Sequence, residues 1–136
     1  MARSAYLDLI GGAAGDMLLG ALLHAGANAE RIRQALASLE LGIRVEVNAT
    51  QRQALAALRV EVLAPGDPQP ERHLPDVLAL IERADLPASV SAQARACFEL
   101  LAEAEASVHG TSVDDVHFHE VGAIDSIADT LSLIHI

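Results

Sequence analysis

The sequence contains no lysine and very few aromatic residues. All nine basic residues are arginine, against nineteen acidic ones, so the net charge is −10 at pH 7. Without lysine there is no lysine nucleophile, Schiff base or P-loop motif. Nucleic-acid binding needs a basic surface, and this composition argues against it. A ligand that carries phosphate is expected to arrive with a metal ion bridging it to the acidic protein.

Cysteine and long apolar runs are also scarce. Cys97 is the only cysteine, so no disulfide can form within the chain, and its helical context predicts a small buried side chain. No run reaches the ~18 apolar residues that span a bilayer. The apolar run near the start is too short for a signal peptide. We therefore expect a cytoplasmic protein that binds neither nucleic acid nor membrane.

The apolar pattern predicts one α+β domain of 136 residues. We expect a small, mostly antiparallel sheet covered by about five helices. The sheet would combine a buried strand at 5–10 with a hairpin formed by 42–49 and 57–64, where apolar and polar residues alternate. Helices are expected at 17–25, from Asn28 to about Gly42, from about Leu74 to 84, from about Ser89 to His109, and after Gly122. Asp16 and Asn28 are the expected N-caps of the first two, and the first helix, apolar nearly all round, is expected to be buried on most sides.

Imidazoles and carboxylates gather in the segment HFHEVGAIDSIAD, residues 117–129. An extended backbone would place the rings of His117 and His119 on the same side. Imidazole together with carboxylate suits Zn, Ni, Fe or Mn. The alternative is that the two histidines merely flank a buried Phe118, with the acids exposed to solvent.

Asp125 and Asp129 stand four residues apart on the last predicted helix. Like charges at this spacing repel each other unless a cation lies between them. A position in the first turn would explain Asp125 through the helix dipole, but it leaves Asp129 unexplained. The candidate metal ligands are therefore His117, His119, Asp125 and Asp129.

Glu105 and His109 fall within the apolar stripe of the long helix when residues are placed at ~100° intervals. A buried carboxylate is costly unless it is paired, protonated or bound to metal. The two residues either form a structural pair that closes the core, or an acid–base pair or ligand beside His117.

The segment LDLIGGAAGDM places two acids around glycines. Asp8 would end the first strand and Asp16 would begin the first helix, while Gly12 and Gly15 would let bare backbone approach a ligand. As a phosphate loop the pattern is unspecific, and its acids would require a cation. Elsewhere, His24 is expected to be a core histidine and His73 to be exposed.

Two blocks of the sequence, LDLIGGAAGDMLLGALL and LLAEAEASVHG followed by VHFHEVGAIDSIAD, resemble the nickel insertion (LarC-type) family over residues 5–129. The resemblance implies an enzyme that inserts Ni²⁺ into pyridinium-3,5-bisthiocarboxylic acid mononucleotide. The product would be the nickel pincer nucleotide cofactor of lactate racemase and related enzymes. It also implies a requirement for CTP and for Mg²⁺ or Mn²⁺.

The family motifs match this sequence at Asp8, Gly15, Asp16, Glu105, His109, His117, His119, Glu120, Gly122, Asp125 and Asp129. With the resemblance, we expect Glu105, His109 and Glu120 to act in catalysis, and Asp8, Gly12, Gly15 and Asp16 to contact the cofactor precursor. Nickel would be bound by the four candidate metal ligands above.

The sequence departs from the family pattern in three respects. The loop after the hairpin has only His73 where members carry a His-rich stretch. Members are about three times longer, so the part that handles the nucleotide triphosphate is expected in a C-terminal domain or a separate chain. Residues 130–136 do not continue the family pattern. We therefore interpret 1–129 as the N-terminal domain and 130–136 as an atypical tail, and do not count His135 as a ligand.

Two other functions remain open from the sequence. One is a nickel-delivery module, which binds and hands over Ni²⁺ without CTP. The other is a metal-dependent phosphohydrolase that uses Asp8, Asp16 and the His/Asp segment around two ions. A homo-oligomer is compatible with each of these functions.

Overall fold

The computed structural model describes residues 4–10, 12–66, 72–118 and 124–136. Along the chain the elements follow in the order α1 (Gly15–His24), α2 (Ala29–Ala37), β1 (Arg44–Arg52), β2 (Leu55–Leu63), β3 (Arg72–His73), α3 (Leu74–Arg83), α4 (Ala88–His109), the 3₁₀ turn η1 (Val113–Asp115), β4 (His117–Phe118) and α5 (Ile124–His135). The predicted α+β class is confirmed, as are five helices over the described residues. None of these helices combines the length and apolar character needed to cross a membrane.

The predicted antiparallel hairpin is confirmed as β1 and β2. Val45 pairs with Val62 and Val47 with Val60, so the alternating apolar side chains share one face. Gln53 and Ala54 form the turn with φ of 45° and 68°. Positive φ at both positions matches the right-handed twist of a two-residue hairpin.

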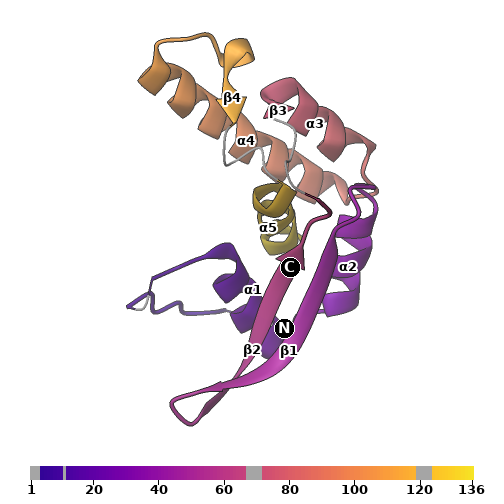
Figure 1. Ribbon diagram of the computed structural model, residues 1–136, viewed down its shortest axis with the longest axis vertical. Coiled ribbons are helices and arrows are strands. Elements are labelled where there is room, and N and C mark those ends of the chain that lie inside the picture. The colour runs from indigo at the N-terminus through magenta and orange to yellow at the C-terminus, as the bar shows by residue number, and fades with distance from the viewer. Residues whose placement is uncertain (1–3, 11, 67–71, 119–123) are drawn as a thin grey trace.

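The strand predicted at 5–10 is wrong. The described residues 4–10 belong to no strand, and Tyr6 and Ile10 are 91% and 92% exposed. In Figure 1 this indigo segment projects from the body of the molecule beside α1. An apolar run forms a buried strand only when a neighbouring strand pairs with it, and no described segment does so here.

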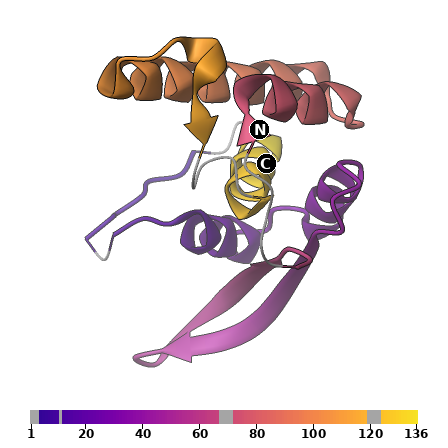
Figure 2. The same ribbon diagram turned by 45° about the horizontal axis from the view of Figure 1, so that its top comes forward.

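Helix α5 lies at the centre of the molecule. Figure 2 shows it between α3 and α4 on one side and α1, α2 and the hairpin on the other. Ile127, Ala128 and Leu131 are fully buried on its inner face. Burial of these apolar side chains positions α5 and fixes which of its residues lie at the edge. Helix α5 passes residue 129 without a break and continues to His135. The domain boundary expected at residue 129 stays a prediction.

A second small sheet was not predicted. Strand β3 pairs antiparallel with β4, which sets Arg72 opposite Phe118 and His73 opposite His117. The ring of Phe118 packs edge-on against Phe98 of α4, with 6.3 Å between ring centroids. This contact holds β4, and with it His117, close to the long helix.

The predicted helix ends are confirmed in part. The Asn28 side chain accepts hydrogen bonds from the amides of Glu30 and Arg31, as an N-cap should. Gly110 ends α4 in the left-handed conformation. Asp16 is not an N-cap, because α1 begins at Gly15 and its cap is Ala14. Asp16 instead lies in the first turn, where the helix dipole favours an acid.

Candidate functional site

Three carboxylates from two helices line a common cavity where α1 packs against α5. Asp16 of α1 and Asp125 and Asp129 of α5 line one cavity of about 350 Å³, together with residues 59–63 of β2. The buried face of α5 leaves Asp125 and Asp129 at its edge, as their spacing predicts. We call Asp16, Asp125 and Asp129 the carboxylate cluster.

Gly15 allows the carboxylate cluster to form. A Cβ atom at Gly15 would overlap the carboxyl group of Asp129 and would lie 2.8 Å from its Cβ. The sequence suggested that this glycine brings backbone close to a ligand. In the structure its missing side chain makes room for Asp129 against the first turn of α1.

Asp129 is held in an unfavourable electrostatic environment. Burial raises the pKa of its carboxyl group above 3.8, and the nearby charges of Asp16 and Asp125 raise this pKa further. Its Oδ1 is buried, and no group among the described residues donates a hydrogen bond to it. A buried carboxylate oxygen without a donor is costly, so a cation bound between these acids would stabilise the charged form.

His117 lies in a different cavity from the carboxylate cluster. Its ring packs against that of His73, with centroids 4.1 Å apart and planes inclined by 52°. His73 Nδ1 donates to the carbonyl oxygen of Val116 at 3.1 Å. The prediction that His73 is exposed is wrong, because β3 pairs with β4 and half-buries it. His117 also lines a cavity of about 240 Å³ with His109 and Asp115.

Glu105 and His109 contact each other, with 3.1 Å between Oε2 and Nε2, which is within hydrogen-bonding distance. This contact is one of the alternatives that the sequence left open. The predicted burial is wrong, since the side chains of Glu105 and His109 are 41% and 61% exposed. The buried stripe of α4 ends at Ala106, and Val108 is 80% exposed. Figure 1 shows why: the last turns of α4 extend past the elements that cover its middle. Helical periodicity indicates the direction in which a side chain points. It does not indicate how far along the helix the neighbouring elements cover it.

The predicted metal ligands are therefore divided between two cavities. Asp125 and Asp129 line one, and His117 lines the other. Within 4–10, 12–66, 72–118 and 124–136, no three His, Cys, Asp or Glu side chains converge closely enough to hold a metal ion. His119 and Glu120 lie outside the described residues, as does Gly122, so the complete ligand set stays a prediction.

Asp8 and Gly12 lie in the exposed N-terminal segment. The Asp8 carboxylate accepts only a long hydrogen bond from the Ile10 amide, at 3.4 Å, among the interactions of the described chain. Gly12 has φ of +92° and open space where a Cβ would stand. Neither residue lines the cavity of the carboxylate cluster, and their role toward a cofactor precursor stays a prediction.

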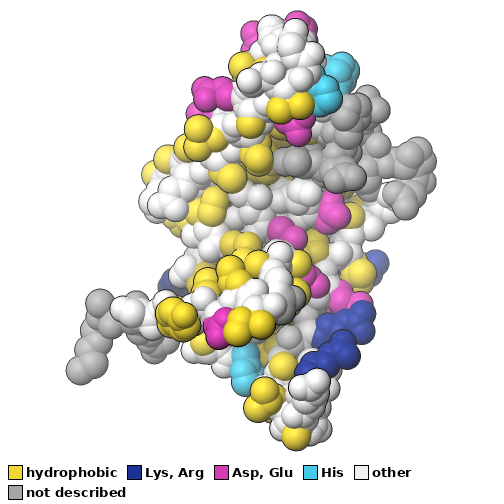
Figure 3. Space-filling model, turned by 90° about the vertical axis from the view of Figure 1, so that its left-hand side faces the viewer, with side chains coloured by type: hydrophobic (Ala, Val, Ile, Leu, Met, Phe, Trp, Pro, Cys, Tyr) yellow, Lys and Arg dark blue, Asp and Glu magenta, His cyan; other side chains and the backbone are white. Residues whose placement is uncertain are grey.

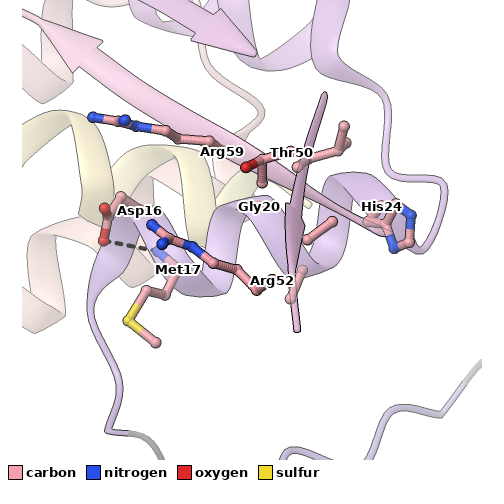
Figure 4. Close-up of a pocket in the computed structure, with 10 residues that line it drawn as sticks. Asp16, Met17, Gly20, His24, Thr50, Arg52 and Arg59 are labelled. Atoms are coloured by element: carbon pink, nitrogen blue, oxygen red, sulfur yellow. Dashed lines mark hydrogen bonds between the residues drawn. The ribbon is translucent and has the colours of Figure 1, made fainter. Parts of the chain in front are cut away.

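The sequence did not reveal a groove of about 680 Å³ between α1 and the hairpin. Figure 4 shows this groove, which is lined by Asp16, Met17, Gly20, Ala21, His24, Thr50, Arg52, Ala57, Leu58 and Arg59. A Cβ at Gly20 would lie 2.7 Å from the carbonyl oxygen of Leu58, so this glycine lets α1 lie directly on β2. The sequence did contain one signal for this groove, because the alternation of polar residues in β1 continues through Thr50 and Arg52.

Comparison with known proteins identifies the family. The family model described as "Nickel insertion protein" matches residues 5–136. The chain belongs to the nickel insertion protein family. Proteins named for nickel insertion from Roseiflexus castenholzii and Thermomicrobium roseum are 44% and 45% identical to it, each over 134 residues. These alignments cover 98% and 97% of this chain.

The chain spans about a third of the length of these curated relatives, 34% of the Roseiflexus protein and 33% of the Thermomicrobium protein. A third relative, from Synechococcus elongatus, is 46% identical over 131 residues, which are 95% of this chain and 33% of that protein. No solved structure matches the chain. The nickel insertion family is thus established for this chain by sequence alone.

Proposed function

We propose that this chain binds Ni²⁺ as a substrate and takes part in its insertion into pyridinium-3,5-bisthiocarboxylic acid mononucleotide. The family and the carboxylate cluster support this proposal. The observation that carries it is the buried Asp129 Oδ1, which lacks a hydrogen-bond donor in the described structure and faces two further acids. Ni²⁺ accepts nitrogen and oxygen ligands. The proposed oxygen ligands are Asp125 and Asp129, with Asp16 beside them. The proposed nitrogen ligands are His117, which lines a separate cavity, and His119, which lies outside the described residues.

Oxygen ligands suit a site that must give up its metal ion. A carboxylate is a hard ligand, whereas the substrate offers soft sulfur, which binds nickel more strongly. A metal ion held by Asp125 and Asp129 can therefore transfer to the substrate with a favourable free energy. Mg²⁺ or Mn²⁺ also suits carboxylates, so either can compete at the cluster.

Proton transfer is the role we propose for Glu105, His109 and Glu120. When a metal ion displaces hydrogen from a ligand atom, a nearby base must accept the proton. The Glu105–His109 pair stands at the end of α4, and His109 lines the same cavity as His117. A carboxylate that holds an imidazole in this way keeps it oriented as a proton acceptor.

The rest of the full-length protein, or a separate chain, would supply CTP handling in this proposal. A delivery module differs because it transfers Ni²⁺ without CTP, so nickel incorporation with and without CTP separates the two functions. The phosphohydrolase alternative required Asp8 beside Asp16. Asp8 is exposed and does not line the cavity or groove that Asp16 lines, so no observation favours that function.

The double substitution His117→Ala/His119→Ala is expected to weaken Ni²⁺ binding about tenfold or more, because the two imidazoles are proposed nickel ligands; this corresponds to at least ~1.4 kcal/mol of binding free energy. Isothermal titration calorimetry of the purified chain measures it. His135→Gln is the matched control and should bind Ni²⁺ like the parent. Unchanged affinity in the double variant would remove both histidines from the site.

A further inference from the structure

The groove between α1 and the hairpin has the size and lining of a small-molecule site. Its volume of about 680 Å³ lies within the ~300–1,000 Å³ that such sites occupy. Met17, Ala21 and Leu58 give it an apolar wall, and His24 and Thr50 add groups able to form hydrogen bonds. Met17 is 53% exposed, although α1 was expected to be buried on most sides.

Two arginines stand at this groove in an otherwise acidic protein. Arg52 comes from the end of β1 and Arg59 from β2. In Figure 4 both guanidinium groups extend toward the end of the groove where Asp16 lies, while His24 lies at the opposite end. Figure 3 shows the main basic patch of this face over the lower part of the molecule, where the hairpin lies. Arginine binds phosphate oxygens with two parallel hydrogen bonds.

Both arginine side chains are accessible to a ligand. Arg59 pairs with Glu61 at 2.8 Å, and its side chain is still 62% exposed. Arg52 is exposed and makes no ion pair with any described residue. An exposed pair such as Arg59–Glu61 contributes little to stability, so a phosphate can compete with Glu61 for the guanidinium group.

The groove adjoins the carboxylate cluster. Asp16 and Arg59 line both the groove and the cavity that contains Asp125 and Asp129. A ligand held by the two arginines therefore lies beside the three acids. A substrate that receives a metal ion from those acids must be bound at such a place.

We propose that this groove binds the organic substrate, a pyridinium mononucleotide, with its phosphate on Arg52 and Arg59. The inference rests on the proposed function and deepens it, because it gives the acceptor of the metal ion a binding site. The apolar wall would cover the uncharged part of the ligand. His24 and Thr50 can bind its ribose hydroxyls.

Nicotinic acid mononucleotide is a suitable probe, and nicotinic acid riboside is the same molecule without the phosphate. Calorimetry with the whole chain should show that Arg52→Gln/Arg59→Gln binds the mononucleotide at least tenfold more weakly than the parent. The riboside should bind the parent weakly and be unaffected by the substitutions. The control Arg33→Gln/Arg95→Gln also removes two arginines that form ion pairs, one exposed and one half-buried, and it should stay within twofold of the parent.

Three results would overturn the inference: no binding of the mononucleotide to the parent at millimolar concentration, equal binding by Arg52→Gln/Arg59→Gln, or equal affinity for the riboside. Circular dichroism and thermal unfolding establish that each variant is folded. Ni²⁺ titration of the same samples separates the two proposals. Loss of mononucleotide binding with unchanged Ni²⁺ affinity supports the groove. If the parent bound the mononucleotide as expected but did not bind Ni²⁺, the proposed function would be contradicted. The assignment of the groove as a mononucleotide site would still stand.

Discussion

The substitution Asp129→Asn is expected to weaken Ni²⁺ binding by about tenfold or more without destabilising the chain at pH 7. An amide keeps the shape of the side chain but removes a charged ligand. It also relieves the repulsion from Asp16 and Asp125, which together with burial raises the pKa of Asp129. Functional acids are commonly retained at a cost in stability. Calorimetry and the melting temperature measure the two effects.

The pH dependence of stability follows from the direction of the same pKa shift. Asp129 holds its proton to a higher pH in the folded chain than in the unfolded chain, where its pKa is near 3.8. The contribution of this group to stability is therefore greatest below pH 3.8 and is lost as pH rises through its folded pKa. In Asp129→Asn this loss should disappear, so the variant gains stability relative to the parent over that interval.

Asp114→Asn is the matched control for this substitution. Asp114 is exposed in η1 and belongs to neither cavity that contains the predicted metal ligands. It should leave Ni²⁺ affinity and melting temperature unchanged. If Asp129→Asn bound Ni²⁺ as tightly as the parent, Asp129 would not be a ligand.

Gly15→Ala is expected to lower the free energy of unfolding by about 1–3 kcal/mol, the usual cost of forcing a methyl group into a packed contact. The new Cβ would overlap the Asp129 carboxyl group. Alanine favours helices, by ~1 kcal/mol over glycine, so an uncrowded position would respond in the opposite direction. Urea unfolding at pH 7 measures the change.

A double-mutant cycle with Asp129→Ala tests the cause of that loss. If the carboxyl group of Asp129 is what the new methyl group meets, the double variant should be more stable than the sum of the two single effects predicts. Simple additivity, or a Gly15→Ala variant more stable than the parent, would show that α1 and α5 do not meet at this glycine.

The sequence predicted correctly those elements that depend on residues only a few positions apart in the chain. Asn28 caps α2 through its own side chain, and Gly110 ends α4 because it adopts positive φ. The hairpin register follows from alternation, since a slip by one residue would turn its valines to the other face. In each case the relevant partners are neighbours in sequence or across a two-residue turn.

Predictions that depended on distant partners were less successful. The apolar run at 5–10 reads as a strand, but pairing needs a second strand, and the described chain provides none. His73 and His117 are far apart in sequence, and only the β3–β4 pairing brings their rings together. The exposure of Glu105 and His109 depends on where the elements that cover α4 end. The periodicity of the sequence carries no information about that position.

The same difference between local and distant partners applies to the candidate site. Helical spacing alone placed Asp125 and Asp129 side by side. Their meeting with Asp16 depends on the packing of α1 against α5, and the role of Gly15 toward Asp129 appears only there. The groove with Arg52 and Arg59 likewise needs α1 to lie on the hairpin, which no local pattern specifies.

Anomalous X-ray diffraction at the nickel edge, from crystals of this chain grown with Ni²⁺, would locate the bound metal ion. We expect a nickel ion between α1 and α5 with a carboxylate oxygen of Asp129 among its ligands. Crystals of Asp129→Asn should lose this anomalous peak. A nickel ion bound elsewhere in the parent, with Asp129 free of metal, would contradict the claim that the carboxylate cluster holds nickel.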